Sequence, residues 1–173
     1  MVRWLQHLLL PNWWRLRDFN SAVLNQIEQA IAESEVGHSG EICFAVEGSL
    51  SLFQLLKGLS PRQRSQDVFS KLRVWDTQNN NGVLIYLLIA DRDVEVVVDR
   101  ACASQINAEQ WQRIADTVKC AAQNDKLVAG VIQAIQQSAE LLREAFPLND
   151  KGDTSAASQP TNPDELPNKP VRL

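Results

Sequence analysis

Carboxylate and amide side chains stand at three places in the sequence that could supply ligands to one metal ion. Asp76 precedes a run of three asparagines at residues 79–81, and Asp99 is followed directly by Arg100. Carboxylate and amide oxygens are the hard ligands that Ca²⁺ and Mg²⁺ bind, and an arginine can hold a phosphate oxygen. The residues therefore predict a metal-assisted phosphoester site, with Asp99 and Arg100 as the catalytic pair and with Glu41, Asp76, Asn79, Asn80 and Asp99 as the metal ligands.

The same residues also fit a purely structural interpretation. Residues 79–82 have the sequence of a turn, since asparagine tolerates left-handed backbone and glycine adopts positive φ without strain. Asp99 and Arg100 could form an ordinary surface ion pair, and residues 91–93 suit a hairpin turn. His38 has no neighbour at metal-ligand spacing and is expected in a loop.

Two strands are expected to position Asp99 and Arg100. Residues 83–89 form an uninterrupted apolar run, which is typical of a strand buried on both faces and is too short to span a membrane. Residues 94–99 place valine at every second position, which predicts a second strand with one wetter face. The polar break at residues 91–93 predicts that the two strands form an antiparallel hairpin.

The remaining elements complete an α/β fold. A largely buried strand is expected at residues 41–47, and a capping box with proline at the first helical position begins a helix near residue 61. This strand, this helix and the strand at 83–89 form a βαβ unit with parallel strands. Further helices are expected from Asn20, from Asn107 and from about residue 126. The predicted fold class is α/β, a three-layer α/β/α sandwich whose small mixed sheet is covered by about four helices.

The predicted topology brings the candidate residues to one edge of the sheet. The first two strands are parallel and the third is antiparallel, so the starts of the first two meet the end of the third. Glu41, residues 76–81 and residues 99–100 fall there. The opposite edge carries Glu47, Ser49 and Asp91, but neither a phosphate-binding loop nor a nucleophile elbow follows the first strand. Nucleotide binding and Ser-His-Asp chemistry are therefore not supported.

A longer pattern resembles a known family. WDT at 75–77, NNGVL at 80–84, ADR at 90–92, VEV at 94–96 and DR at 99–100 are together similar to the TPM domain. GEICFAVEGSL at 40–50 and AFP at 145–147 extend the resemblance over residues 19–147, and it is closest to a soluble proteobacterial branch of the family. The resemblance implies an α/β fold and carries a phosphatase label. The chain departs from the pattern at residues 101–103, where related sequences tend to have a glycine, and at the polar turn of residues 123–126.

Length and composition limit the number of domains and the class of partner. A chain of 173 residues with 45% hydrophobic content can bury one sizeable core. Three parts are expected: a Trp/Arg-rich segment at 1–18, the α/β domain at 19–147 and a disordered proline-rich tail at 148–173. A net charge of −4 without a basic run argues against nucleic acid. Three scattered cysteines, Cys43, Cys102 and Cys120, favour reduced thiols and a cytoplasmic location.

The N-terminal segment carries the prediction of a partner. Trp4, Trp13 and Trp14 accompany three arginines, and the apolar patch at 8–10 is too short for a signal peptide or a transmembrane segment. These tryptophans either pack on the domain edge or meet a membrane-associated protein partner, which would make the protein peripheral at the inner membrane. Two functions are compatible with the sequence. The favoured one is a non-catalytic accessory or scaffold module that binds Ca²⁺ or Mg²⁺, and the alternative is a weak metal-assisted phosphatase acting on phosphomonoesters.

Overall fold

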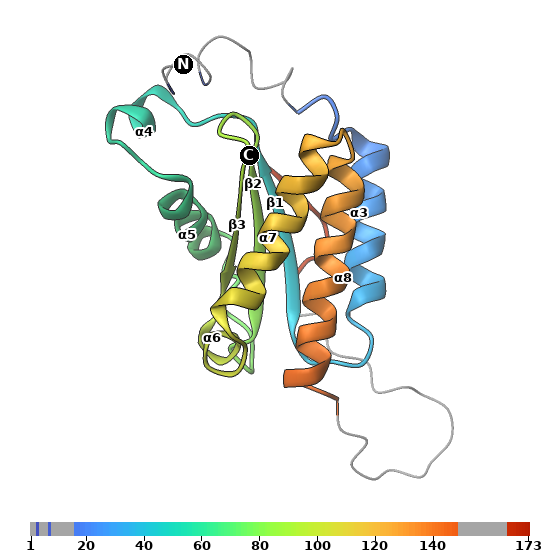
Figure 1. Ribbon diagram of the computed structural model, residues 1–173. Coiled ribbons are helices and arrows are strands. Elements are labelled where there is room, and N and C mark those ends of the chain that lie inside the picture. Colours follow the sequence, from blue (N-terminus) through green and yellow to red (C-terminus); the bar gives the residue numbers. More distant parts are fainter. Residues whose placement is uncertain (1–2, 4–6, 8–15, 149–165) are drawn as a thin grey trace, which may run out of the picture.

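The computed structural model describes residues 3, 7, 16–148 and 166–173, and a four-stranded sheet forms the centre of this part of the chain (Figure 1). Its strands lie in the spatial order β3-β2-β1-β4 and are β1 (Glu41–Glu47), β2 (Gly82–Leu88), β3 (Asp93–Val98) and β4 (Val171–Arg172). β1 and β2 are parallel, and β2 and β3 are antiparallel. Every residue of β1 and β2 is buried. The predicted βαβ unit and hairpin are therefore confirmed.

Three of the four long helices begin at caps that the sequence indicates. The Asn20 side chain accepts a hydrogen bond at the start of α3, and capping boxes begin α5 at Ser60 and α7 at Asn107. Two short helices, α4 and α6, were not predicted. The helices are α3 (Ser21–Ser34), α4 (Leu52–Leu56), α5 (Pro61–Lys71), α6 (Arg100–Gln105), α7 (Ala108–Gln123) and α8 (Leu127–Ala145).

Two apolar cores lie on the two faces of the sheet. Alternate residues of β1, such as Ile42 and Phe44, pack with α3, α7 and α8 on one face. The intervening residues, such as Cys43 and Ala45, pack with α5 and with Leu166 on the other face. In Figure 1 the helices α3, α7 and α8 stand together and α5 lies apart from them. This arrangement confirms the α/β sandwich with a small mixed sheet.

The end of the tail corrects one prediction. The sequence predicts disorder over residues 148–173, but β4 pairs in parallel with β1, and the Leu173 N–H donates to the Val46 carbonyl at 3.0 Å. Composition identifies segments that cannot form a core of their own. It does not show that an existing sheet edge with unpaired backbone groups can bind such a segment. Residues 149–165 of the predicted tail lie outside the described residues.

Only part of the N-terminal segment can be compared with its prediction. Arg3 and His7 are described, whereas Trp4, Trp13 and Trp14 lie outside the described residues. Among the helices that the structure describes, none has both the length and the apolar character needed to cross a bilayer.

Candidate functional site

Glu41 and Asp99 flank Gly82 at one edge of the sheet. Glu41 is the neighbour of Gly82 across the parallel pair, and the Asp99 N–H donates to the Gly82 carbonyl at 2.9 Å. Laterally adjacent residues in a sheet project from the same face. For Glu41 that face is the one covered by α5, because Cys43 and Ala45 pack there. The structure therefore places these two predicted carboxylates on either side of a residue without a side chain.

Asp99 is held by the helix that follows it. Its Oδ1 accepts a hydrogen bond of 2.7 Å from the Arg100 N–H at the start of α6, and the residue is only 6% exposed. Its other oxygen, Oδ2, is buried and has no hydrogen-bond partner within the described parts of the chain. A buried carboxylate oxygen usually has a donor or a cation beside it. Asp99 thus retains one unused ligand atom.

The asparagine loop is fixed against the same helix. Asn80 has φ 52° in the left-handed region, as the turn interpretation predicts, and its carbonyl accepts from the Ala101 N–H at 3.0 Å. The Asn80 Oδ1 accepts from the Arg100 Nη2 at 2.7 Å. Arg100 is otherwise exposed, with 84% of its side chain accessible and its Nε 3.8 Å from the Asp99 Oδ1. The loop, Asp99 and Arg100 therefore form one local unit.

Asn81 is the buried member of the loop. Its Nδ2 donates to the Ser39 carbonyl at 3.0 Å and to the Ser39 hydroxyl at 3.1 Å, and the residue is 0% exposed. These two bonds fix the orientation of the side-chain amide. The Oδ1 on its other side is buried and has no hydrogen-bond partner among the described residues. The sequence placed Asn81 at this edge but assigned the ligand role to its neighbours Asn79 and Asn80 instead.

Other predicted residues do not join this group. Asp76 forms an exposed ion pair with Arg73, and Asn79 is exposed. His38 lies in the loop between α3 and β1, as expected, and it is completely buried there and forms a bridge with Pro147. Burial lowers the pKa of His38 below its ordinary value. In the described residues, no three His, Cys, Asp or Glu side chains are grouped so that they could hold a metal ion. Any cation at this edge would therefore need amide or carbonyl ligands as well.

The nearby thiol is unsuited to nucleophilic attack. Cys102 follows Arg100 by two positions in α6 and is completely buried. Burial, together with the charge of Asp99, raises the pKa of the Cys102 thiol to about 12. A thiol with that pKa stays protonated at neutral pH, and only the thiolate is a good nucleophile. The edge therefore offers oxygen ligands and a guanidinium without a covalent nucleophile.

Comparison with protein families identifies the domain. A family model described as TPM domain matches residues 19–141. This chain belongs to the TPM domain family. No curated protein sequence matches it. A similar solved structure is the NMR structure of the BA42 protein from the psychrophilic bacterium Bizionia argentinensis, with a TM-score of 0.73 and 22% sequence identity over 89% of this chain and 94% of that one. At that identity the likeness shows the fold.

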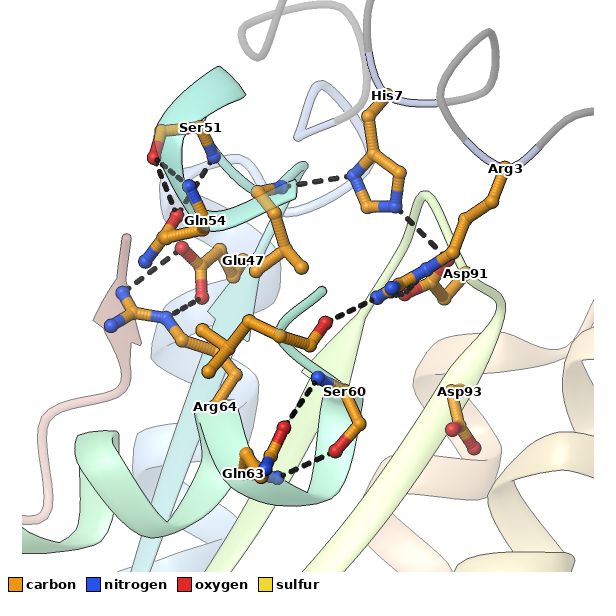
Figure 2. Close-up of polar contacts among 12 residues, drawn as sticks. Arg3, His7, Glu47, Ser51, Gln54, Ser60, Gln63, Arg64, Asp91 and Asp93 are labelled. Carbon is orange, nitrogen blue, oxygen red and sulfur yellow. Dashed lines mark hydrogen bonds and ion pairs between the residues drawn. The ribbon is translucent and has the colours of Figure 1, made fainter. Parts of the chain in front are cut away.

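The opposite edge of the TPM domain contains a polar cluster that sequence analysis missed. Figure 2 shows Arg3 and His7 at the carboxylate of Asp91, in the turn between β2 and β3. Arg3 donates to Asp91 from Nε at 3.0 Å and from Nη2 at 2.7 Å, and its Nη2 also donates to the Leu59 carbonyl at 2.9 Å. The turn interpretation of Asp91 is therefore incomplete. This carboxylate also ties the N-terminal segment to the domain.

His7 is bound through both of its ring nitrogens. The Leu50 N–H donates to Nδ1 at 3.0 Å, so Nδ1 must be unprotonated. The proton of the neutral ring then lies on Nε2, which is 3.0 Å from the Asp91 Oδ1 and donates to it. The second nitrogen of a catalytic histidine would face a serine or a substrate, whereas here it faces backbone. The His7–Asp91 pair is therefore structural.

The Arg3 and His7 contacts predict a pH-dependent stability. Burial raises the pKa of Asp91, but the hydrogen bonds from Arg3 and His7 outweigh that effect, so its pKa lies below the ordinary value of 3.8. A carboxylate with a depressed pKa stabilises the fold above its ordinary pKa, and the stabilisation is lost as the pH falls through the folded-state pKa. In urea unfolding at pH 7, Asp91→Asn should lower the free energy of unfolding by about 1.5–3 kcal/mol.

The difference between wild type and Asp91→Asn should shrink as the pH falls below 3.8. Asp93→Asn is the matched control, because Asp93 makes a partly exposed pair with Lys119 and should contribute less than about 1 kcal/mol. A loss from Asp91→Asn no larger than that from Asp93→Asn at pH 7 would contradict the assigned contacts.

A second buried ion pair lies beside this cluster. Glu47 at the end of β1 accepts from the Arg64 Nε at 2.8 Å and Nη2 at 3.0 Å, and from the Tyr86 hydroxyl at 2.6 Å. Glu47 and Arg64 are 5% and 7% exposed, and Tyr86 is fully buried. Burial and the neighbouring Glu47 carboxylate raise the pKa of the Tyr86 hydroxyl, which therefore remains a donor. The group joins β1, α5 and β2 of the TPM domain.

Proposed function

We propose that this chain is a non-catalytic TPM module that binds a divalent cation, Ca²⁺ or Mg²⁺, at the edge formed by Asp99 and Asn81. The observation that carries the proposal is the pair of buried acceptor atoms, Asp99 Oδ2 and Asn81 Oδ1, for which the described residues provide no donor. Unsatisfied buried acceptors are rare because desolvating them is costly. A cation would supply what both atoms lack. Hard oxygen ligands of this kind favour Ca²⁺ or Mg²⁺ over softer metals.

The proposed ligand set differs from the one predicted from sequence, because it adds Asn81 and leaves out Asp76 and Asn79. Asp99 and Asn81 supply the side-chain oxygens, and Glu41 supplies a second carboxylate from the other side of Gly82. The Asn80 Oδ1 could join them if Arg100 released it. Asp76 and Asn79 are exposed on the same loop, and Asp76 is engaged by Arg73, so the proposal gives them no ligand role. A site with two carboxylates and amide oxygens should bind a divalent cation with weak or moderate affinity.

The phosphatase alternative rests on Arg100. Its exposed guanidinium lies next to Asp99 and could hold a phosphate oxygen while a cation-bound water attacks. The chain offers little general-base capacity for that reaction. His38 is fully buried, and His7 lies at the opposite edge with both nitrogens occupied. For this reason we favour cation binding without turnover.

Cation titration tests the proposal directly. Backbone amide NMR shifts should respond saturably to Ca²⁺ or Mg²⁺ at Asn80, Asn81, Gly82 and residues 99–101. Asp99→Asn should weaken binding at least about tenfold because it removes one charge of the site, which corresponds to about 1.4 kcal/mol. Asparagine is also a good N-cap, so α6 and the fold should persist in this variant.

Asp76→Asn is the matched control for the titration. It removes a carboxylate from the same loop but from an exposed position, so the affinity should stay within about twofold of wild type. Absence of shifts up to millimolar ion, or equal loss in both variants, would contradict the site. Turnover of a phosphomonoester that disappears in Arg100→Gln would instead favour the phosphatase.

A further inference from the structure

Helix α4 presents an unusual apolar surface. Leu52, Phe53 and Leu56 are 51%, 64% and 62% exposed, whereas Leu55 on the same helix is 3% exposed and packs in the core beside α5. In Figure 1 this helix stands away from the sheet at the end opposite to the cation edge, directly after β1. We refer to Leu52, Phe53 and Leu56 as the α4 tip. Three adjacent large apolar side chains exposed together indicate an interaction surface.

The conformation of the α4 tip is fixed by its own caps. The Ser51 hydroxyl accepts from the Gln54 N–H, and the Gln54 side chain in turn accepts from the Ser51 N–H at 2.8 Å (Figure 2). At the other end, the Lys57 N–H donates to the Phe53 carbonyl at 3.1 Å, and Gly58 takes φ +68° in the left-handed region. Five residues are too few for a stable isolated helix. These caps and the buried Leu55 hold the three apolar side chains outward.

The sequence around the α4 tip lacks acidic residues. Residues 49–66 contain three of the 17 basic residues of the chain and none of its 21 acidic residues. Arg3 and His7 bind the backbone of this stretch through the Arg3–Leu59 and His7–Leu50 hydrogen bonds. Arg3, Arg62 and Arg64 are paired with Asp91, Glu95 and Glu47, so these pairs largely neutralise the three arginines. Lys57, in contrast, has no ion-pair partner in the part of the chain that the structure describes, so the α4 tip is apolar with one uncompensated positive charge beside it.

Lys57 contributes a cation at the α4 tip itself. Its Nζ lies 4.3 Å from the centroid of the Phe53 ring, and Lys57 is exposed. A lysine beside apolar side chains can extend its ammonium group to lipid phosphates while its methylene groups lie at the acyl boundary. Basic side chains near an anionic membrane surface add to the affinity from apolar insertion.

We propose that the α4 tip inserts into the headgroup region of an anionic lipid bilayer and makes this domain a peripheral membrane protein. Three side chains on a convex, five-residue helix present far less area than the roughly 800 Å² per partner of a standard protein interface. Shallow insertion into lipid needs only a protruding apolar group with cations beside it. The proposal goes beyond cation binding and does not depend on it, because the two surfaces lie at opposite ends of β1.

Vesicle sedimentation with the full chain tests the proposal. The protein should sediment with vesicles of phosphatidylcholine and phosphatidylglycerol, and less with phosphatidylcholine alone. The triple variant Leu52→Ser/Phe53→Ser/Leu56→Ser should bind the anionic vesicles at least about tenfold more weakly. The matched control is Val36→Ser/Trp75→Ser, which removes exposed apolar side chains of 59% and 47% exposure elsewhere and should bind as wild type does. Lys57→Glu should weaken binding to the anionic vesicles only.

Three results would overturn the proposal. Absence of sedimentation with any vesicle would show that lipid is not the ligand. Self-association of the protein through the α4 tip would show the same. Wild-type affinity in the triple variant would show that another segment binds the lipid. Since all substituted side chains are more than half exposed in the triple variant, its fold should be intact, and circular dichroism melting checks this.

A fluorescent probe gives a readout that does not depend on removing the apolar side chains. Phe53→Cys in a Cys120→Ser background can be labelled with an environment-sensitive dye, since Cys43 and Cys102 are buried. Its emission should shift to the blue on addition of anionic vesicles, whereas the same dye at Val36→Cys should not respond. Equal responses at the two positions, or none at position 53, would contradict insertion of α4.

Discussion

Arg64→Ala should destabilise the domain by about 3–5 kcal/mol, which is among the largest effects expected for any single substitution. The variant leaves the Glu47 carboxylate buried, without the two hydrogen bonds of 2.8 and 3.0 Å that Arg64 donates. The remaining donor, the Tyr86 hydroxyl, cannot neutralise a full charge. An uncompensated buried charge costs far more than the intact pair contributes. Urea unfolding at pH 7, followed by circular dichroism, measures the loss.

Two further variants distinguish the charge effect from lost packing. Tyr86→Phe removes one hydrogen bond to Glu47 and should cost only about 1.5–3 kcal/mol. Glu47→Leu/Arg64→Leu removes both charges and should be clearly more stable than Arg64→Ala, because apolar replacements of a buried pair are often neutral. A loss below about 1 kcal/mol in Arg64→Ala would mean that water reaches Glu47, as in an exposed ion pair.

Local patterns in the sequence were sufficient to predict the sheet and its main helices. β2 is visible as an unbroken apolar run, and β3 as an alternation of valines. The capping boxes at Ser60 and Asn107 each lie within four consecutive residues. The crossover rule then fixed the parallel order of β1 and β2. These features are local in sequence or follow from general chirality, so no distant contact had to be known.

Features that depend on distant contacts were missed. His7 meets Asp91 across 84 positions, and β4 meets β1 across more than a hundred, and neither pairing leaves a periodic pattern. The Glu47–Arg64 pair was missed for the same reason, since a charged residue at a strand end is ordinarily exposed. α4 was missed for another reason, because its five residues are too few to show a helical period.

At the candidate edge, too, the sequence predicted the features set by topology and missed those set by packing. Topology correctly brought Glu41 and Asp99 to one edge of the sheet, because strand order and direction determine which strand ends meet. Topology could not show which asparagine turns inward. That choice depends on the Asn81 contact with Ser39 and on the left-handed backbone of Asn80, which are properties of a packed loop. Likewise, Asp76 turns to Arg73 at the surface rather than to the edge.

Gly82→Ala should be the second severe substitution, and it tests how this edge is built. A Cβ at position 82 would lie 1.9 Å from the Val74 carbonyl oxygen, so the backbone leading into the asparagine loop would have to move. Overpacking against backbone should cost at least about 3 kcal/mol in urea unfolding, and the amide shifts of Asn81 and Asp99 should change with it. Gly40→Ala is the control, since its Cβ would meet only side-chain atoms, those of the buried Leu142, the nearest at 2.8 Å, and no backbone. Its cost should be less than half as large. Equal costs for the two variants would mean that the Val74 backbone moves as easily as a side chain. In that case the close approach of the Val74 carbonyl would not require a glycine at position 82.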